Sequence, residues 1–512
     1  MTVLMEVARQ RPGLRMIEMK TVIVGAGFGG LAAAALLARD GAEVTVLEKN
    51  EQAGGRASVH RDAGFTFDMG PSWYLMPDVF DRFFAVFGRK PADFFELKRL
   101  DPSYRIFFGN GRAVDIPSDT EKTIALFDTF EKDGGEKLRR YLKSAEEMYT
   151  LAMQDMLYRD YKSVLDFFSG RLLFKGPKLV SVFENLDSFV ERYFTSDEAK
   201  KIVQYSIGFL GGAPSNTPAL YHIMSHIDLT MGVFYPEGGI RAVVEAVRDL
   251  AAEHGAEFRF NEPATRIQVK RDRAVAVETA AGRYPADVVL VNADYPHAEL
   301  SLLDDQARTY SRKYWSERVL APSAMVLYLG LNRQVEGLAH HTLLLEKDWE
   351  KGFETLFDPA KAAWPESPSY YVNVPSKTDT TAAPPGGETL FVLVPLAPGL
   401  PDTPDRRQLL RDHLLTHLEA TIGEPIRDAI VSERCFALDD FATRYNAYKG
   451  TALGLSHTLS QTALWRPAHR SKKVSNLYYS GQYTHPGIGV PMTLISSQIV
   501  AKEIAEEQMK RR

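Results

Sequence analysis

The chain has 512 residues, of which 45% are hydrophobic and 25% charged, with a formal net charge of −5 at pH 7. This length exceeds what one hydrophobic core supports, so we expect two interwoven domains. The mildly acidic balance, without a basic stripe interleaved with aromatic residues, argues against a nucleic-acid partner. The single cysteine, Cys435, excludes an internal disulfide framework and a cysteine-based metal site, and is compatible with a reducing cytoplasm.

Residues 1–18 carry arginines but no sustained apolar core, so we expect an N-terminal extension and not a secretory signal. The longest apolar stretches, such as residues 31–38, fall well below the roughly 20 residues needed to span a bilayer. We therefore predict no transmembrane helix.

The first predicted unit is a strand from near Lys20, a glycine-rich turn, an Ala/Leu-rich helix and a second strand ending at Glu48. The turn reads Gly25-Ala26-Gly27-Phe28-Gly29-Gly30. In a dinucleotide-binding βαβ unit, its first glycine permits the tight turn, Gly27 lets the backbone approach the pyrophosphate, and Gly30 lets the helix pack on the sheet. Glu48 is placed to accept hydrogen bonds from ribose hydroxyls. The alternative, a turn that binds nothing, is disfavoured because all four parts occur in order.

After Glu48 the chain reads Lys49-Asn-Glu-Gln-Ala-Gly54-Gly55-Arg56, and later Gly70-Pro71-Ser72. This resembles the second glycine signature of the amine oxidase and phytoene desaturase superfamily of FAD proteins. The resemblance implies that Gly54, Gly55 and Arg56 hold the FAD pyrophosphate, with Lys49 beside them, and that residues 70–72 pass near the isoalloxazine. A guanidinium suits a diphosphate, although Arg56 could also be a surface arginine in a turn.

Residues 476–496 resemble the C-terminal signature of carotenoid desaturases of the bacterial and archaeal phytoene desaturase type, through Gly481-Gln482 and Gly489-Val490-Pro491-Met492. We expect a short strand over 477–480, a Gly/Pro turn and a helix from near Val490 to about Met509. Its N-terminus suits the ribityl chain and the pyrimidine edge of a flavin. Many relatives have an acidic residue where this chain has Gln482, but an amide can still bind a ribityl hydroxyl.

Weaker matches connect the two ends. Residues 235–240 resemble the family's turn before a buried helix, and 261–267, with Ala264, the strand whose backbone holds the adenine. Residues 287–294 resemble the strand that returns to the flavin domain. Apolar residues from Ile240 to Leu250 recur at helical spacing, which predicts a helix there.

We therefore predict an α/β fold with a Rossmann-type FAD-binding domain (19–100, 231–300 and 470–512). It is interwoven with a mixed-sheet plus helical substrate-binding domain (101–230 and 301–469). The first half of the substrate domain has a helical pattern, and its second half has alternating runs typical of strands, such as 324–329 and 389–394.

The resemblance implies an FAD-dependent carotenoid desaturase, which introduces double bonds into a long-chain polyene by hydride transfer to flavin. A hydrophobic carotenoid substrate requires docking at a membrane, so we expect a cytoplasmic protein held peripherally at the inner face of the cell membrane. Residues 164–180 are the docking candidate, although they could equally be core-facing helices. Because one dinucleotide-binding unit occurs, we expect oxygen or a quinone as the electron acceptor.

Two alternatives stay open. A carotenoid isomerase or saturase of the same superfamily would share the FAD motifs. A prenyl- or lipid-binding module with an idle FAD fold would not need Gly27, Glu48, Arg56 and the Gly487-Ile488-Gly489 turn together, so their joint presence favours an enzyme. A flavin amine oxidase is disfavoured because the tail lacks the pattern of that branch.

Histidines add little to the predicted chemistry. His222 and His226 lie four residues apart, but no third ligand is evident, so we expect no metal site. His485, before Pro486 in the C-terminal turn, could shuttle a proton or be structural. We assign no catalytic residue from the sequence.

Overall fold

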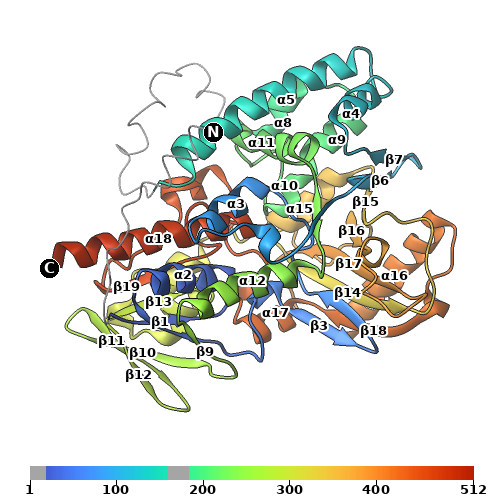
Figure 1. The fold of residues 1–512 in the computed structure, drawn as a ribbon. Coiled ribbons are helices and arrows are strands. Elements are labelled where there is room, and N and C mark those ends of the chain that lie inside the picture. The colour runs from blue at the N-terminus through green and yellow to red at the C-terminus, as the bar shows by residue number, and fades with distance from the viewer. Residues whose placement is uncertain (1–18, 160–183, 512) are drawn as a thin grey trace.

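The computed structural model of the chain describes residues 19–159 and 184–511. Within these ranges a five-stranded and a seven-stranded sheet form the body of the molecule, and helices α4, α5, α8, α9 and α11 gather at the top of Figure 1. The predicted α/β fold, a Rossmann-type unit joined to a mixed sheet and helices, is confirmed. The N-terminal extension (1–18) and the docking candidate (164–180) lie outside the described residues. None of the described helices is both long and apolar enough to cross a membrane.

The five-stranded sheet is parallel and brings distant parts of the chain together in the order β19-β13-β1-β2-β9. Its strands are β19 (Leu477–Tyr479), β13 (Val288–Val291), β1 (Lys20–Val24), β2 (Glu43–Leu47) and β9 (Glu257–Arg259). The strands predicted near residues 20, 43–48 and 477–480 are confirmed. Because the strands are parallel, their carboxyl ends share one edge, and the turns that follow them converge there.

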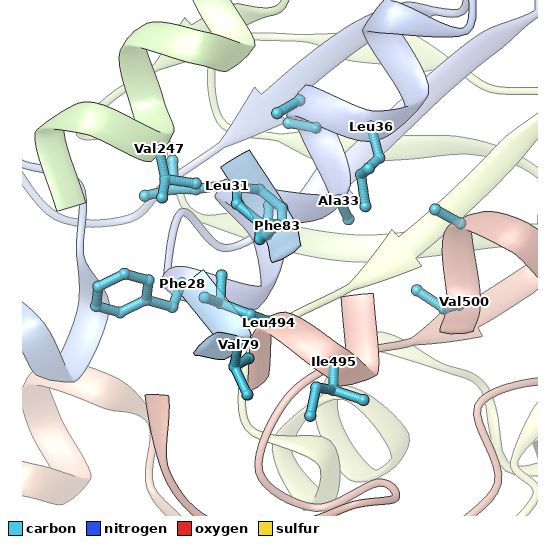
Figure 2. Close-up of a cluster of buried hydrophobic side chains, with 14 of the residues drawn as sticks. Phe28, Leu31, Ala33, Leu36, Val79, Phe83, Val247, Leu494, Ile495 and Val500 are labelled. Carbon is cyan, nitrogen blue, oxygen red and sulfur yellow. The ribbon is translucent and has the colours of Figure 1, made fainter. Parts of the chain in front are cut away.

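Both faces of this sheet are covered, as the alternation along β1 requires. Ile23 belongs to the apolar cluster of helix α2, whereas Val22 and Val24 pack with the small sheet β10-β11-β12. The helices α2 (Phe28–Arg39), α3 (Pro77–Ala85), α12 (Ile240–Glu253) and α18 (Val490–Arg511) share the first cluster. Figure 2 shows Leu31 of α2 beside Phe83 and Val247. The strands of the small sheet are Ala264–Lys270, Arg273–Thr279 and Arg283–Pro285.

The seven-stranded sheet has the order β18-β14-β17-β16-β15-β6-β7 and is antiparallel except between β15 and β6. The strands are, in that order, Ile430–Phe436, Ser323–Leu331, Glu388–Leu396, Tyr370–Asn373, His341–Leu345, Tyr104–Phe108 and Ala113–Ile116. The runs predicted as strands at 324–329 and 389–394 are confirmed as β14 and β17. Leucines of α16 (Pro404–Ile422) cover one face, and the other face carries Tyr328, Tyr371 and Phe391.

The helical pattern expected for residues 101–230 was wrong at its start, where β6 and β7 form. Side chains along β6 alternate between buried and half-buried, which is a strand pattern. The helices there and beyond are α4 (Thr120–Phe127), α5 (Gly134–Leu151), α8 (Leu186–Glu191), α9 (Asp197–Gln204), α10 (Ser206–Phe209), α11 (Ile223–His226), α13 (Tyr295–His297), α14 (Arg312–Ser316), α15 (Trp349–Phe357) and α17 (Leu438–Tyr445). Two two-stranded antiparallel sheets complete the fold: the hairpin of β3 (Val59–Asp62) and β4 (Phe65–Asp68), and the long-range pair of β5 (Leu97–Arg99) and β8 (Phe234–Pro236).

Candidate active site

One cavity of about 1040 Å³ joins the glycine-rich turn to the inner face of the seven-stranded sheet. It exceeds the roughly 300–1,000 Å³ of ordinary small-molecule sites. Its lining contains every residue predicted to bind the cofactor except Ala26 and Gly30. One end is formed by the turns at the carboxyl edge of the parallel sheet, and the other by aromatic side chains.

The glycine-rich turn is crowded by Asn292, which follows β13. A Cβ on Gly27 would lie 2.8 Å from the Asn292 Oδ1 atom, and one on Gly29 would collide with Nδ2 of the same side chain. Asn292 Nδ2 donates to the carbonyl oxygen of Ser480 at 2.9 Å, which ties the turn to the strand β19. A Cβ on Gly30 would collide with the carbonyl of Gly25, so Gly30 serves the packing of the turn and does not face the cavity.

Glu48 braces the turn from the second strand. Its carboxylate accepts from the backbone N–H of Ala26 at 2.8 Å and of Asn50 at 2.8 Å. The side chain is buried, and this burial raises the pKa of the Glu48 carboxyl, while the hydrogen bonds from Asn50 and Ala26 oppose the shift. Lys49 also lines the cavity, and its Nζ donates to the carbonyl of Thr443 and to Asn446 Oδ1.

Arg56 lies in the cavity wall between an acid and an aromatic ring. Its Nη2 is 3.6 Å from Asp294 Oδ2, and its guanidinium carbon is 5.5 Å from the centre of the Tyr445 ring. Asp294 is buried and also accepts from the Tyr483 hydroxyl at 2.8 Å. Burial raises the pKa of Asp294 to about 6, and the positive charge of Arg56 opposes that rise.

The C-terminal turn forms another part of the cavity wall. Gly481, Gln482 and Gly489 line the cavity there, together with Val490, Pro491 and Met492 in the first turn of α18. The buried guanidinium of Arg466 donates to the carbonyls of Gln482 and Thr484 and so fixes this turn from behind. The predicted helix from Val490 is confirmed, because α18 starts at that residue.

The other predicted lining segments are residues 70–72 and Ala264. Gly70, Pro71 and Ser72 follow β4, and a Cβ on Gly70 would lie 2.5 Å from the carbonyl oxygen of Arg56. Ser72 shares a hydrogen bond of 2.9 Å with the Tyr371 hydroxyl on β16. Ala264 starts β10 beside Glu48, since the Glu262 N–H donates to the Glu48 carbonyl.

The far end of the cavity is aromatic and contains one buried acid. Trp73 lies between Tyr205 and Tyr371, with ring centres 6.2 Å and 5.9 Å away, and further lining rings come from residues such as Phe209 and Phe391. Asp228 lines this end, is only 4% exposed, and accepts from the Tyr205 hydroxyl at 2.7 Å and the Tyr104 hydroxyl at 3.2 Å.

The sequence predictions missed Asn292, Asp294, Tyr483 and Asp228. Asn292 and Asp294 could have been found, because they directly follow a buried strand whose carboxyl end shares an edge with β1. Asp228 has no such signal, since it is a lone acid in a short apolar run and reaches the cavity through a single π-helical turn, Ile227–Met231.

The histidines are held by neighbouring groups. The ring nitrogens of His222 are within hydrogen-bond distance of the Ala219 carbonyl and of Ser144 Oγ. His485 lines the cavity, its Nε2 contacts the carbonyls of Met156 and Leu157, and burial lowers its pKa to about 3. Across residues 19–159 and 184–511, no group of three or more His, Cys, Asp or Glu side chains could hold a metal ion.

Two buried polar atoms support an occupied dinucleotide end. Arg56 Nε and Gln482 Nε2 have no hydrogen-bond partner among the described residues, and both side chains line the cavity. Buried donors are rarely left unpaired, because each costs about 1–3 kcal/mol. A phosphate and a sugar hydroxyl are acceptors of the kind that these donors require, so the residues fit the expected dinucleotide.

Comparisons with known proteins agree with this geometry. The model of the family "Flavin containing amine oxidoreductase" matches residues 28–505. The carotenoid 3,4-desaturase of Haloarcula japonica is 47% identical, over 95% of this chain and 98% of that protein. The zeta-carotene-forming phytoene desaturase of Myxococcus xanthus is 33% identical, over 95% and 93%.

Solved structures show the same fold at low sequence identity. An oxidoreductase from Methanosarcina mazei superposes with a TM-score of 0.60 at 16% identity, and the match covers 94% of this chain and 100% of that one. The family match spans nearly the whole chain, and the desaturases match it end to end. The chain therefore belongs to the flavin-containing amine oxidoreductase family and, within it, to the carotenoid desaturases.

Proposed function

We propose that this desaturase uses FAD and acts on a long-chain carotenoid, whose conjugated system it extends by removing hydrogen. The observation that carries the proposal is the continuity of this cavity, because it joins a dinucleotide-type turn to a chamber lined by aromatic rings. A polyene gains by burial against such rings, while the polar end of the same cavity suits a diphosphate.

Each part of FAD has candidate partners in the cavity wall. Arg56 and the N-terminus of α2 would hold the pyrophosphate, and Glu48 and Ala264 would face the adenosine. Gln482 would bind the ribityl chain, and Val490 to Met492 would lie against the pyrimidine edge. The flavin supplies hydride acceptance when bound, and the chain's own residues orient it and exclude water.

We extend the proposal to the domains. Residues 19–100, 231–300 and 470–512 would form the FAD-binding domain, because all strands of the five-stranded sheet come from these ranges. Residues 101–230 and 301–469 would form the substrate domain, because they supply the whole seven-stranded sheet.

We also propose that the protein works at the inner face of the cell membrane, held there peripherally, and passes electrons to oxygen or a quinone. The argument is chemical: a carotenoid partitions into the bilayer, so its enzyme must collect it there. Residues 164–180 combine aromatic and leucine side chains with Lys and Arg, a composition suited to an anionic membrane surface.

The test has two measurements. Flavin released from the denatured purified protein is separated by chromatography, and FAD is expected, whereas FMN alone would contradict the cofactor assignment. Co-expression in a colourless host that makes phytoene is followed by pigment extraction and mass analysis. Products lighter by pairs of hydrogens support desaturation, products of unchanged mass indicate an isomerase, and heavier products indicate a saturase.

A further inference from the structure

Desaturation removes two hydrogens from neighbouring carbons, and flavin chemistry accounts for only one of them. If one leaves as hydride, the other must leave as a proton, so the reaction needs a proton acceptor near the substrate. The candidates for that acceptor are the side chains that line the cavity.

Six carboxylates line the described cavity: Glu48, Asp228, Asp294, Glu346, Asp348 and Glu366. Glu48 and Asp294 belong to the dinucleotide end, where the backbone of Ala26 and the side chain of Arg56 engage them. The last three are exposed or half-exposed. Asp228 is the one that is buried among the aromatic rings.

The lining histidines are already engaged. His457 contacts the Tyr221 hydroxyl through Nδ1 and accepts from the Ile488 N–H through Nε2. His297 Nε2 accepts from Asn446 Nδ2 at the dinucleotide end. His485 is held at backbone carbonyls, where an imidazole must donate, so its Nε2 cannot accept a proton from a substrate.

The geometry of Asp228 leaves one carboxylate oxygen available. Oδ2 accepts from two tyrosine hydroxyls, whereas Oδ1 has no hydrogen-bond partner among the described residues. Both tyrosines pack against Trp73, at 5.5 Å for Tyr104 and 6.2 Å for Tyr205. Trp73 directly follows Ser72, so the two tyrosines and Trp73 connect the carboxylate to the segment expected beside the isoalloxazine.

We propose that the Asp228 carboxylate is the base of the reaction, which rests on the proposed desaturase function. Oδ1 takes the proton from the substrate carbon adjacent to the one that loses hydride to the bound flavin. The electron pair left by that proton would form the new C=C bond, the hydride from the neighbouring carbon would carry two electrons to the bound flavin, and Asp228 would become a carboxylic acid. The two tyrosines orient the carboxylate.

The electrostatics of the position agree with this role. The titratable groups that face the carboxyl are Tyr104 on β6, Tyr205 after α9 and Tyr141 on α5. Burial raises the pKa of Asp228 to about 7, and the hydrogen bonds from Tyr205 and Tyr104 limit the rise. A base is most effective when its pKa lies near the working pH, because it is then both ionised and strongly basic.

The experiment compares Asp228→Asn with Asp228→Glu in the flavin-loaded protein. Glu388→Gln is the matched control: Glu388 is a buried carboxylate paired with Lys377, and it does not line the cavity. Each protein is mixed with carotenoid in the absence of oxygen, and the rate of flavin bleaching is recorded. Flavin content and carotenoid affinity are measured separately. Asp228→Asn is expected to slow bleaching by about 100-fold to 10,000-fold with unchanged flavin content and affinity. Asp228→Glu should restore part of the rate, and Glu388→Gln should bleach normally.

A pH profile separates proton transfer from a structural role. The wild-type rate should rise with pH through a midpoint of about 7, as the carboxyl ionises. Tyr205→Phe removes a donor that favours the carboxylate, so its midpoint should move to higher pH. Infrared difference spectra without substrate should show a protonated-carboxyl band at low pH that is absent from Asp228→Asn.

The outcomes are distinguishable. If Asp228→Asn bleaches its flavin at the wild-type rate, Asp228 is not the base. A loss of bleaching rate matched by an equal loss of carotenoid affinity would overturn the assignment as well. An unmoved pH midpoint in Tyr205→Phe would do the same. If the wild-type protein binds flavin but no carotenoid bleaches it, the proposed function itself fails, irrespective of Asp228.

Discussion

The Arg56 guanidinium lies 3.6 Å from the Asp294 carboxylate, whose side chain is fully buried. Arg56 lies in the segment after β2 and Asp294 in the segment after β13, two strands of one parallel sheet, so the fold itself creates the pair. An arginine expected to bind a diphosphate is thus also the cation that a buried acid requires.

Arg56→Ala should reduce retention of flavin far more than it changes folding at low pH. The pKa of Asp294 is raised to about 6, so the folded state favours its protonated form. Stability therefore falls as pH rises from about 4 to about 6 and stays low above that range. In Arg56→Ala the pKa of Asp294 rises further. The Tm of this variant should therefore fall below the wild-type Tm by more at about pH 8 than at about pH 5. Arg56→Lys is the control that keeps a charge, and unchanged flavin content in Arg56→Ala would contradict the assigned role.

Glu48→Ala should release flavin because it removes the acceptor of two backbone N–H groups. Ala26 and Asn50 donate to this carboxylate, and an unpaired buried donor costs about 1–3 kcal/mol. Glu43→Ala, at the exposed start of the same strand, is the matched control. The flavin-to-protein absorbance ratio after gel filtration measures the effect, and equal ratios for the two variants would refute it.

Gly27→Ala tests what the second glycine is for. The backbone at Gly27 has φ −72°, which alanine adopts without strain, so the expected obstacle is the contact of 2.8 Å with Asn292 Oδ1. If that contact is decisive, the double variant Gly27→Ala, Asn292→Ala should bind more flavin than Gly27→Ala. If the double variant binds no more flavin than Gly27→Ala, the added methyl group obstructs the cofactor itself and not Asn292. Asn292→Ala alone controls for loss of the Ser480 hydrogen bond.

Replacing Phe167, Phe168 and Phe174 by aspartate should abolish co-sedimentation with anionic liposomes and leave flavin content intact. The prediction rests on the composition of residues 164–180. Leu409→Asp is the control, since Leu409 is 75% exposed on α16 and its removal deletes an exposed apolar side chain elsewhere. Undiminished liposome binding by the triple variant would contradict the docking role and favour the alternative that the segment packs in the protein core.

The sequence by itself determined the strand–turn–helix–strand unit with its glycine-rich turn and the flavin class of the cofactor. Glycine spacing and the terminal Glu48 are local requirements of a βα turn, so they can be read without knowing the rest of the fold. The periodicity of residues 240–250 likewise sufficed to place α12. The relatives' family was visible because its motifs occur in the same order at both ends of the chain.

Only the tertiary structure decided which residues share the cavity. Asn292 and Asp294 meet Gly27 and Arg56 because β13 lies next to β1, a pairing of strands more than 260 residues apart. Residues 104–116 carry a local hairpin signal, the Gly109-Asn110-Gly111 turn between two apolar runs, which the helical prediction overlooked. Only the tertiary structure decided that β6 of this hairpin pairs with β15. Asp228 is an ordinary acid in the sequence, and burial among Tyr104, Tyr205 and Trp73 gives it a raised pKa and a chemical role. Burial and long-range pairing depend on the whole fold, whereas turn and helix requirements are local.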